Sequence, residues 1–100
     1  MSKQEITALL QHYPLWQLDE ERLRRVFRFE RFPDSVQFVN QIAELAEEAH
    51  HHPNIAIENK RLVRVDLWTH KMDCITVRDA ALADRLEQLF QTATGAVHVE

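Results

Sequence analysis

The chain has few of the residues that cross-link or interrupt a polypeptide. Its 100 residues include one cysteine, one glycine and three prolines. A single cysteine excludes a disulfide within the chain and is typical of a reducing compartment, so we expect a cytoplasmic protein. This length suffices for one hydrophobic core, and no linker, repeat or low-complexity stretch divides it. The sequence therefore predicts a single domain over residues 1–100.

Long apolar runs and an excess of positive charge are also missing. No apolar stretch approaches the roughly 20 residues that a membrane-spanning helix needs, and no charged and then apolar leader opens the chain. The net charge is −4, whereas nucleic-acid backbones select basic surfaces. We therefore expect neither a membrane nor a nucleic acid as a partner.

Hydrophobic periodicity predicts the element order α-β-β-α-β-β-α. Apolar residues recur at helical spacing in three segments and alternate with polar residues in four others. Helices are expected at 1–14, from 33 to about 50 or 51, and from 76 to a point before Gly95; strands are expected at 15–19, 22–32, 54–58 and 61–70; residues 96–100 are expected to form a loose tail.

This order predicts an α+β fold, in which an antiparallel four-stranded sheet is covered by helices on one face. Such a sheet keeps two free edges and an open face, which favours oligomerisation. Arg22, Arg24 and Arg25 follow Glu20 and Glu21, and we expect this cluster on a solvated strand face.

A β-hairpin in the second half of the chain brings distant residues together. If residues 59–60 form a two-residue turn, Asn54 faces Val65. Continued beyond the strands, the same register places position 49 opposite His70. We therefore expect the end of the second long helix to lie near the end of the last strand.

Four of the six histidines gather at this place. His50, His51 and His52 follow one another at the helix end, and His70 arrives from the strand. Histidines at a helix C-terminus can satisfy free carbonyls and suit the helix dipole, but that use does not require His70. Imidazoles in unlike environments can give and take a proton near neutral pH. General acid–base chemistry is therefore the favoured interpretation.

A metal site is the first alternative to acid–base chemistry. Zinc takes three or four converging imidazole, thiolate or carboxylate ligands, usually at fixed spacings. Here the histidines are contiguous, no His-x-x-x-His pair is present, and Cys74 stands alone. The sequence therefore predicts no metal site.

Three residues near the histidines are candidates for a supporting role. Glu47, one helical turn before the histidine run, is either a solvated glutamate or an orienting carboxylate. Asp79 either completes a capping box with Thr76 or orients a histidine, and the two roles are compatible. Trp68, on the open face of the sheet, could stack on a flat ligand or lie in an interface.

The motifs that these residues form match those of one known family. The chain resembles the pterin-4a-carbinolamine dehydratases. It shares their signature in Glu47-x-x-x-His51-His52-Pro53, Thr69-His70 and Ile75-Thr76-x-x-Asp79. The N-terminal half of the same family is similar to Trp16, Leu23-x-x-x-Phe27-x-Phe29 and Phe32. The resemblance covers about residues 16–90.

The resemblance implies an enzyme with the same element order that forms dimers or tetramers. Family members remove water from 4a-hydroxytetrahydropterin, the product of aromatic amino acid hydroxylases, and give quinonoid dihydropterin without a metal or organic cofactor. By this resemblance, His51 and His52 act at the leaving hydroxyl group and His70 is the base. The supporting or substrate-binding residues are then Glu47, Asp79, Pro53, Trp68 and Thr69.

Three positions depart from the family's pattern. His50 stands where an acidic or polar residue is usual, Ile55 where an aromatic one is frequent, and Cys74, next to Asp73, where a glycine is normal. None of these departures removes a proton-transfer group. The alternative function is a non-catalytic oligomeric binding module, since animal relatives also act as dimerisation cofactors for a transcription factor.

Overall fold

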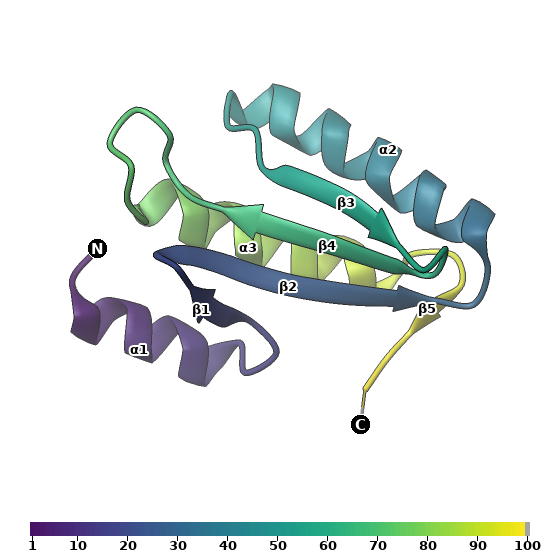
Figure 1. Cartoon of the computed structure of the whole chain (residues 1–100), viewed down its shortest axis with the longest axis horizontal. Helices are drawn as coiled ribbons and strands as arrows, with labels where there is room; N and C mark the ends of the chain where they lie inside the picture. Colours follow the sequence, from purple (N-terminus) through teal and green to yellow (C-terminus); the bar gives the residue numbers. More distant parts are fainter. Residues whose placement is uncertain (100) are drawn as a thin grey trace.

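The computed structural model describes residues 1–99 as one antiparallel sheet with three helices (Figure 1). The expected α+β class and the order of the first seven elements are confirmed, and a short eighth element follows. Among the helices of this described part, none has the length and apolar character needed to cross a bilayer. The elements are α1 Lys3–His12, β1 Gln17–Asp19, β2 Arg22–Phe29, α2 Phe32–Ala49, β3 Asn54–Glu58, β4 Leu62–Leu67, α3 Val77–Gln91 and β5 Ala96–Val97.

The sheet has the strand order β1-β2-β4-β3, and β5 also pairs with β2, which makes five strands instead of four. β1 pairs only with the first three residues of β2, so the rest of that edge is open to another strand. The expectation of a loose tail is therefore wrong for residues 96–97, whereas Glu100 lies outside the described residues. Gly95 turns the chain into β5 with a φ of +72°, and its carbonyl accepts a hydrogen bond from Glu30 N–H.

The β3–β4 hairpin is one residue out of the expected register. Asn54 pairs with Asp66, whereas the sequence predicted Val65. Three residues connect the strands instead of two, and Asn59 and Lys60 both adopt the left-handed conformation, with φ of 50° and 68°. Hairpins with three-residue loops are common, and nothing in this glycine-free turn distinguishes the two lengths.

Three of the four expected strands are shorter than expected, whereas β3 has the expected bounds. β2 ends at Phe29 because α2 begins at Phe32, and β4 ends at Leu67. Beyond β4 the chain makes an isolated bridge between Thr69 and Cys74, which closes a tight loop. His70 therefore lies in a loop and not at the end of a strand.

The core lies between the sheet and the helices α2 and α3. Phe27 and Phe29 of β2 meet Phe38 of α2 and Phe90 of α3, with ring centroids 4.9 to 5.8 Å apart in tilted or edge-on contacts. Such geometries suit the charge distribution of aromatic rings. The expected core face of β4 belongs to the same buried cluster: Val63, Val65 and Leu67. Both helices thus cover one face of the sheet, as expected.

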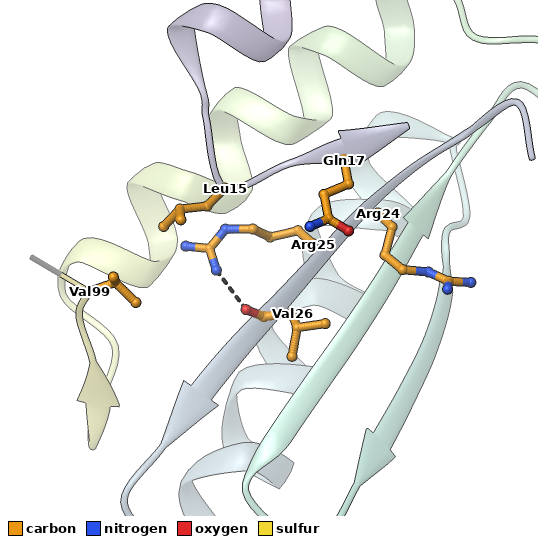
Figure 2. A pocket seen from close by; sticks show the side chains of 6 residues that line it. All are labelled: Leu15, Gln17, Arg24, Arg25, Val26 and Val99. Carbon is orange, nitrogen blue, oxygen red and sulfur yellow. Dashed lines mark hydrogen bonds between the residues drawn. The ribbon is translucent and has the colours of Figure 1, made fainter. Parts of the chain in front are cut away.

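Arg25 is the polar member of the core face of β2. We expected it on a solvated face, but it is only 5% exposed. Its guanidinium donates to Glu87 of α3 at 2.8 Å and to the carbonyl of Val26 at 2.7 Å, beside a cavity of about 140 Å³ between β1 and the end of the chain (Figure 2). A buried charge is tolerated here because it is paired and hydrogen-bonded.

The helix α1 buries none of its residues completely, and the segment after it is tied to α3. The expected capping box at Ser2 is present. Tyr13 donates its hydroxyl to Asp84, and the indole N–H of Trp16 donates to Glu87 at 2.9 Å. These two hydrogen bonds fix the connection between α1 and β1 on α3.

The bond from Tyr13 to Asp84 predicts an unusual titration of the only tyrosine in the chain. The carboxylate accepts the phenolic proton, and this raises the pKa of Tyr13 from 10.0 to about 12. The associated stabilisation is fully present below pH 10.0, the unfolded value, and is lost as the pH rises towards about 12. Tyrosinate absorbance during alkaline titration measures this pKa directly.

The Asp84→Asn variant provides the control for this titration, because it removes the negative charge and keeps the shape. Its Tyr13 pKa should fall towards the ordinary value of about 10. Circular dichroism at each pH verifies that the protein is still folded. A wild-type tyrosine that titrates near its ordinary pKa in folded protein would contradict the hydrogen bond between Tyr13 and Asp84.

Candidate active site

The end of α2, the loop after β4 and the start of α3 meet at one end of the sheet, on the left of Figure 1. The helix α2 ends at Ala49, and His50 takes the left-handed conformation with φ 50° and ψ 42°. Histidine tolerates this conformation better than most residues with a side chain. Because the chain turns here, His51 and His52 leave the helix in different directions, and β3 starts directly after Pro53.

His51 is directed into the protein and meets a buried carboxylate. Its side chain is 6% exposed, and its Nε2 lies 2.5 Å from Oδ1 of Asp79, which is fully buried. The carboxylate can only accept, so Nε2 of His51 carries the proton in this bond. The neutral imidazole then has its lone pair on Nδ1, which is the atom through which His51 can exchange a proton.

Asp79 is held by two further donors on its other oxygen. Oδ2 accepts hydrogen bonds from the Thr69 hydroxyl and from the Thr76 N–H, both at 2.9 Å. The Thr69 hydroxyl also lies 2.6 Å from the Thr76 hydroxyl. Since Thr69 gives its only hydroxyl proton to Asp79, Thr76 donates in that contact. Asp79 thus completes the capping box of α3 and orients His51 at the same time.

His52 points the other way, towards solvent. Its Nε2 donates to Oε2 of Glu47, and both side chains are exposed. This hydrogen bond and the positive charge of protonated His52 hold the pKa of Glu47 below its ordinary value. Of the two carboxylates expected near the histidines, Glu47 therefore serves His52 and Asp79 serves His51.

A cavity of about 160 Å³ brings the histidines together. Its lining consists of His50, His51, His52, Thr69, His70, Lys71 and Arg78. All three histidines expected to act on a ligand reach this cavity, and Thr69 lies with them. Glu47, Pro53, Trp68 and Asp79 do not line it, so the described structure places these four behind or beside the histidines.

Three residues at this place were not singled out from the sequence as part of the site. Thr76 was assigned only to a helix cap, and Lys71 to a loop. Arg78 was interpreted as a surface residue, but its guanidinium donates to the carbonyls of His50 at 2.6 Å and Ala49 at 3.4 Å. The signal in the sequence that could have found Arg78 was its position next to Asp79. In the structure, Arg78 donates to the carbonyl of His50 and Asp79 accepts from His51.

The loop after β4 has Cys74 where the family normally has a glycine, and the neighbouring residue Asp73 takes the left-handed conformation. Asp73 adopts the left-handed conformation, with φ of 49°, while Cys74 pairs with Thr69 in extended form. Glycine visits this conformation routinely, and aspartate is one of the few other residues that adopt it on occasion. The loop therefore remains tight although Cys74 replaces the usual glycine.

The arrangement of side chains at this place does not favour a metal site. Among residues 1–99, no three side chains of histidine, cysteine, aspartate and glutamate converge so that they could hold a metal ion. His51 and His52 each have their Nε2 engaged with a different carboxylate. The arrangement is suited to proton transfer by imidazoles that have unlike surroundings.

The fold and the cavity define a small α+β protein with a site built on histidines. The sequence profile of the pterin 4 alpha carbinolamine dehydratases matches residues 1–89 of the chain. A protein of Thermomicrobium roseum that bears a provisional pterin-4-alpha-carbinolamine dehydratase name is 46% identical over 84 residues, which cover 84% of this chain and 89% of that protein. The chain belongs to the pterin-4a-carbinolamine dehydratase family.

Two solved structures are similar in fold. The transcriptional coactivator/pterin dehydratase of Brucella melitensis superposes with a TM-score of 0.82 at 27% identity, over 89% of this chain and 96% of that one. A pterin dehydratase-like protein described as a RuBisCO assembly factor in the alpha-carboxysome gives a TM-score of 0.60 at 25% identity, over 74% and 84% of the two chains. The family fold therefore occurs in proteins with different described roles.

Proposed function

We propose that the protein catalyses the loss of water from a 4a-hydroxytetrahydropterin, which gives the quinonoid dihydropterin. The observation that carries this proposal is the convergence of His51, His52 and His70 on one cavity in a chain of this family. In the reaction the bond between C4a and the hydroxyl oxygen breaks. One proton is added to the leaving oxygen and one is removed from the pterin ring, so a single water molecule is released.

The surroundings of the three histidines support different roles. His51, whose Nε2 is held by the buried carboxylate of Asp79, can take up a proton on Nδ1 and pass it to the leaving hydroxyl group. His52, with Glu47, assists at the same oxygen. His70 is exposed on the loop after β4, where it can take the proton from the pterin ring. An aromatic amino acid hydroxylase would supply the substrate.

A stopped-flow assay of 4a-hydroxytetrahydrobiopterin dehydration tests this function. The wild-type protein should accelerate the reaction above its uncatalysed rate, and His70→Ala should lower the accelerated part by about 100-fold, the usual contribution of one acid or base. His12→Ala is the matched control, because this histidine lies on α1 outside the cavity. A wild-type rate equal to the uncatalysed rate would exclude the dehydratase function.

A non-catalytic role is the alternative, because one similar structure is described as a transcriptional coactivator as well as a pterin dehydratase, and the other as a RuBisCO assembly factor. In that case the surfaces of the protein would matter and the histidines would not. The same assay separates the two functions, since a binding module gives no acceleration with any of the variants.

A further inference from the structure

His70 is in contact with a row of side chains outside the cavity. Its imidazole stacks on the indole of Trp68, with ring centroids 4.2 Å apart and planes inclined by 19°. The guanidinium of Arg22 lies 4.2 Å from the centre of the same indole. Arg22 also pairs with Asp73 at 3.0 Å. The row Asp73–Arg22–Trp68–His70 thus joins the start of β2 to the loop after β4.

His70 needs such a contact because little else fixes its side chain. The residue is exposed, and its backbone carbonyl accepts a hydrogen bond from Asp73 N–H at 3.2 Å, which orders the loop but not the imidazole. An exposed side chain without a partner samples several rotamers. Stacking on an aromatic ring restricts this freedom, and the cation over the indole holds the indole itself.

We propose that Arg22 and Trp68 are positioning residues that orient the imidazole of His70 towards the cavity. The proposal rests on the proposed dehydratase function, in which His70 takes a proton from the pterin ring. A proton-transfer group works only when it is held within hydrogen-bond reach of the atom that it serves. Trp68 supplies the surface on which the imidazole lies, and Arg22 secures that surface.

The stack with His70 gives Trp68 a different role from ligand stacking. The sequence left open whether Trp68 stacks on a flat ligand or lies in an interface, but the indole is already stacked with His70 and does not line the cavity. Trp68 therefore acts through His70 and not through contact with the substrate. The two roles make different predictions for the kinetic constants.

Proton NMR measures the stack without reference to activity. The indole ring current should shift the His70 ring protons, assigned with the His70→Ala variant, away from their positions in an unstructured peptide. In Trp68→Leu, which keeps an apolar side chain but has no ring, these signals should return towards the unstructured positions. Unshifted His70 signals in the wild-type protein would overturn the proposal.

Steady-state kinetics then measures what the stack contributes to the reaction. Trp68→Leu should lower kcat by about tenfold with little change in KM, because a displaced catalytic group costs rate and not binding. Trp68→Phe, which restores a ring, should recover most of kcat. Arg22→Ala should lower kcat by about threefold, since the indole remains but is held less firmly. A rise in KM at constant kcat would indicate ligand stacking and overturn the proposal.

Two comparisons make this test specific. Arg24→Ala is the matched control for Arg22→Ala, because Arg24 lies on the same strand face but pairs with Asp19 and Asp66, and it should leave kcat unchanged. In a His70→Ala background, Trp68→Leu should cause no further loss, whereas independent effects would multiply and contradict the proposal. If wild-type protein shows no acceleration, the dehydratase function fails, while the NMR comparison still decides whether Trp68 orients His70.

Discussion

In urea denaturation, the Asp79→Ala variant should lose about 3 to 5 kcal/mol of the free energy of unfolding of the wild-type protein. Asp79 is fully buried and accepts hydrogen bonds from His51, Thr69 and Thr76. Removal of the carboxylate leaves three donors without an acceptor, and it also opens the capping box of α3. Domains are stable by only about 5 to 15 kcal/mol, so this loss is a large fraction of the total.

A second aspartate on α3 provides the control for this measurement. Asp84 is half-buried and accepts from Tyr13 and Gln88, so Asp84→Ala should cost about 1 kcal/mol. Asp79→Asn keeps the shape and one acceptor, and its loss should fall between those of the two alanine variants. Equal losses for Asp79→Ala and Asp84→Ala would contradict the conclusion that the buried network stabilises the fold.

Features set by neighbours along the chain were predictable from the sequence. The capping boxes at Ser2 and Thr76 depend on residues three positions apart, and both are present. The bounds of β3 and the core face of β4 followed from alternation with a period of two. Local geometry alone fixes these features, so no knowledge of the tertiary structure was needed.

Features that depend on a distant partner were not predictable in the same way. Arg25 interrupts an apolar strand face, and only the presence of Glu87 on α3 makes its burial possible. The register of the β3–β4 hairpin depends on the loop length, which the glycine-free turn does not reveal. Residues 96–97 form a strand because β1 leaves part of the edge of β2 free.

The site shows both kinds of feature. The sequence predicted that His70 would lie near the histidine run, and the structure brings them to one cavity, although the expected register of the β3–β4 hairpin was wrong. The sequence suggested that Glu47 and Asp79 could each orient a histidine, but the pairing of each carboxylate with one particular histidine was not predicted. It depends on the left-handed conformation of His50, which directs His51 inward to Asp79 and leaves His52 beside Glu47.

In the dehydration assay, His51→Gln should lower the accelerated part of the rate by at least about 100-fold and leave the stability nearly unchanged. A glutamine can still donate an amide N–H to the buried carboxylate of Asp79, so the network that stabilises α3 keeps its donor. The same side chain cannot take up and release a proton near neutral pH. Stopped-flow kinetics and urea denaturation of the same variant measure the two effects separately.

His51→Gln and Asp79→Ala therefore separate chemistry from architecture at a single buried contact. The first should lose activity without stability, and the second should lose both, because a displaced His51 would no longer reach the leaving hydroxyl group of the proposed reaction. Asp79→Ala should then add no further rate loss in the His51→Gln background, since both changes remove the same proton transfer. If His51→Gln instead keeps the wild-type rate, the pair of His51 and Asp79 serves only the fold, and the proton must come from His52 or His70.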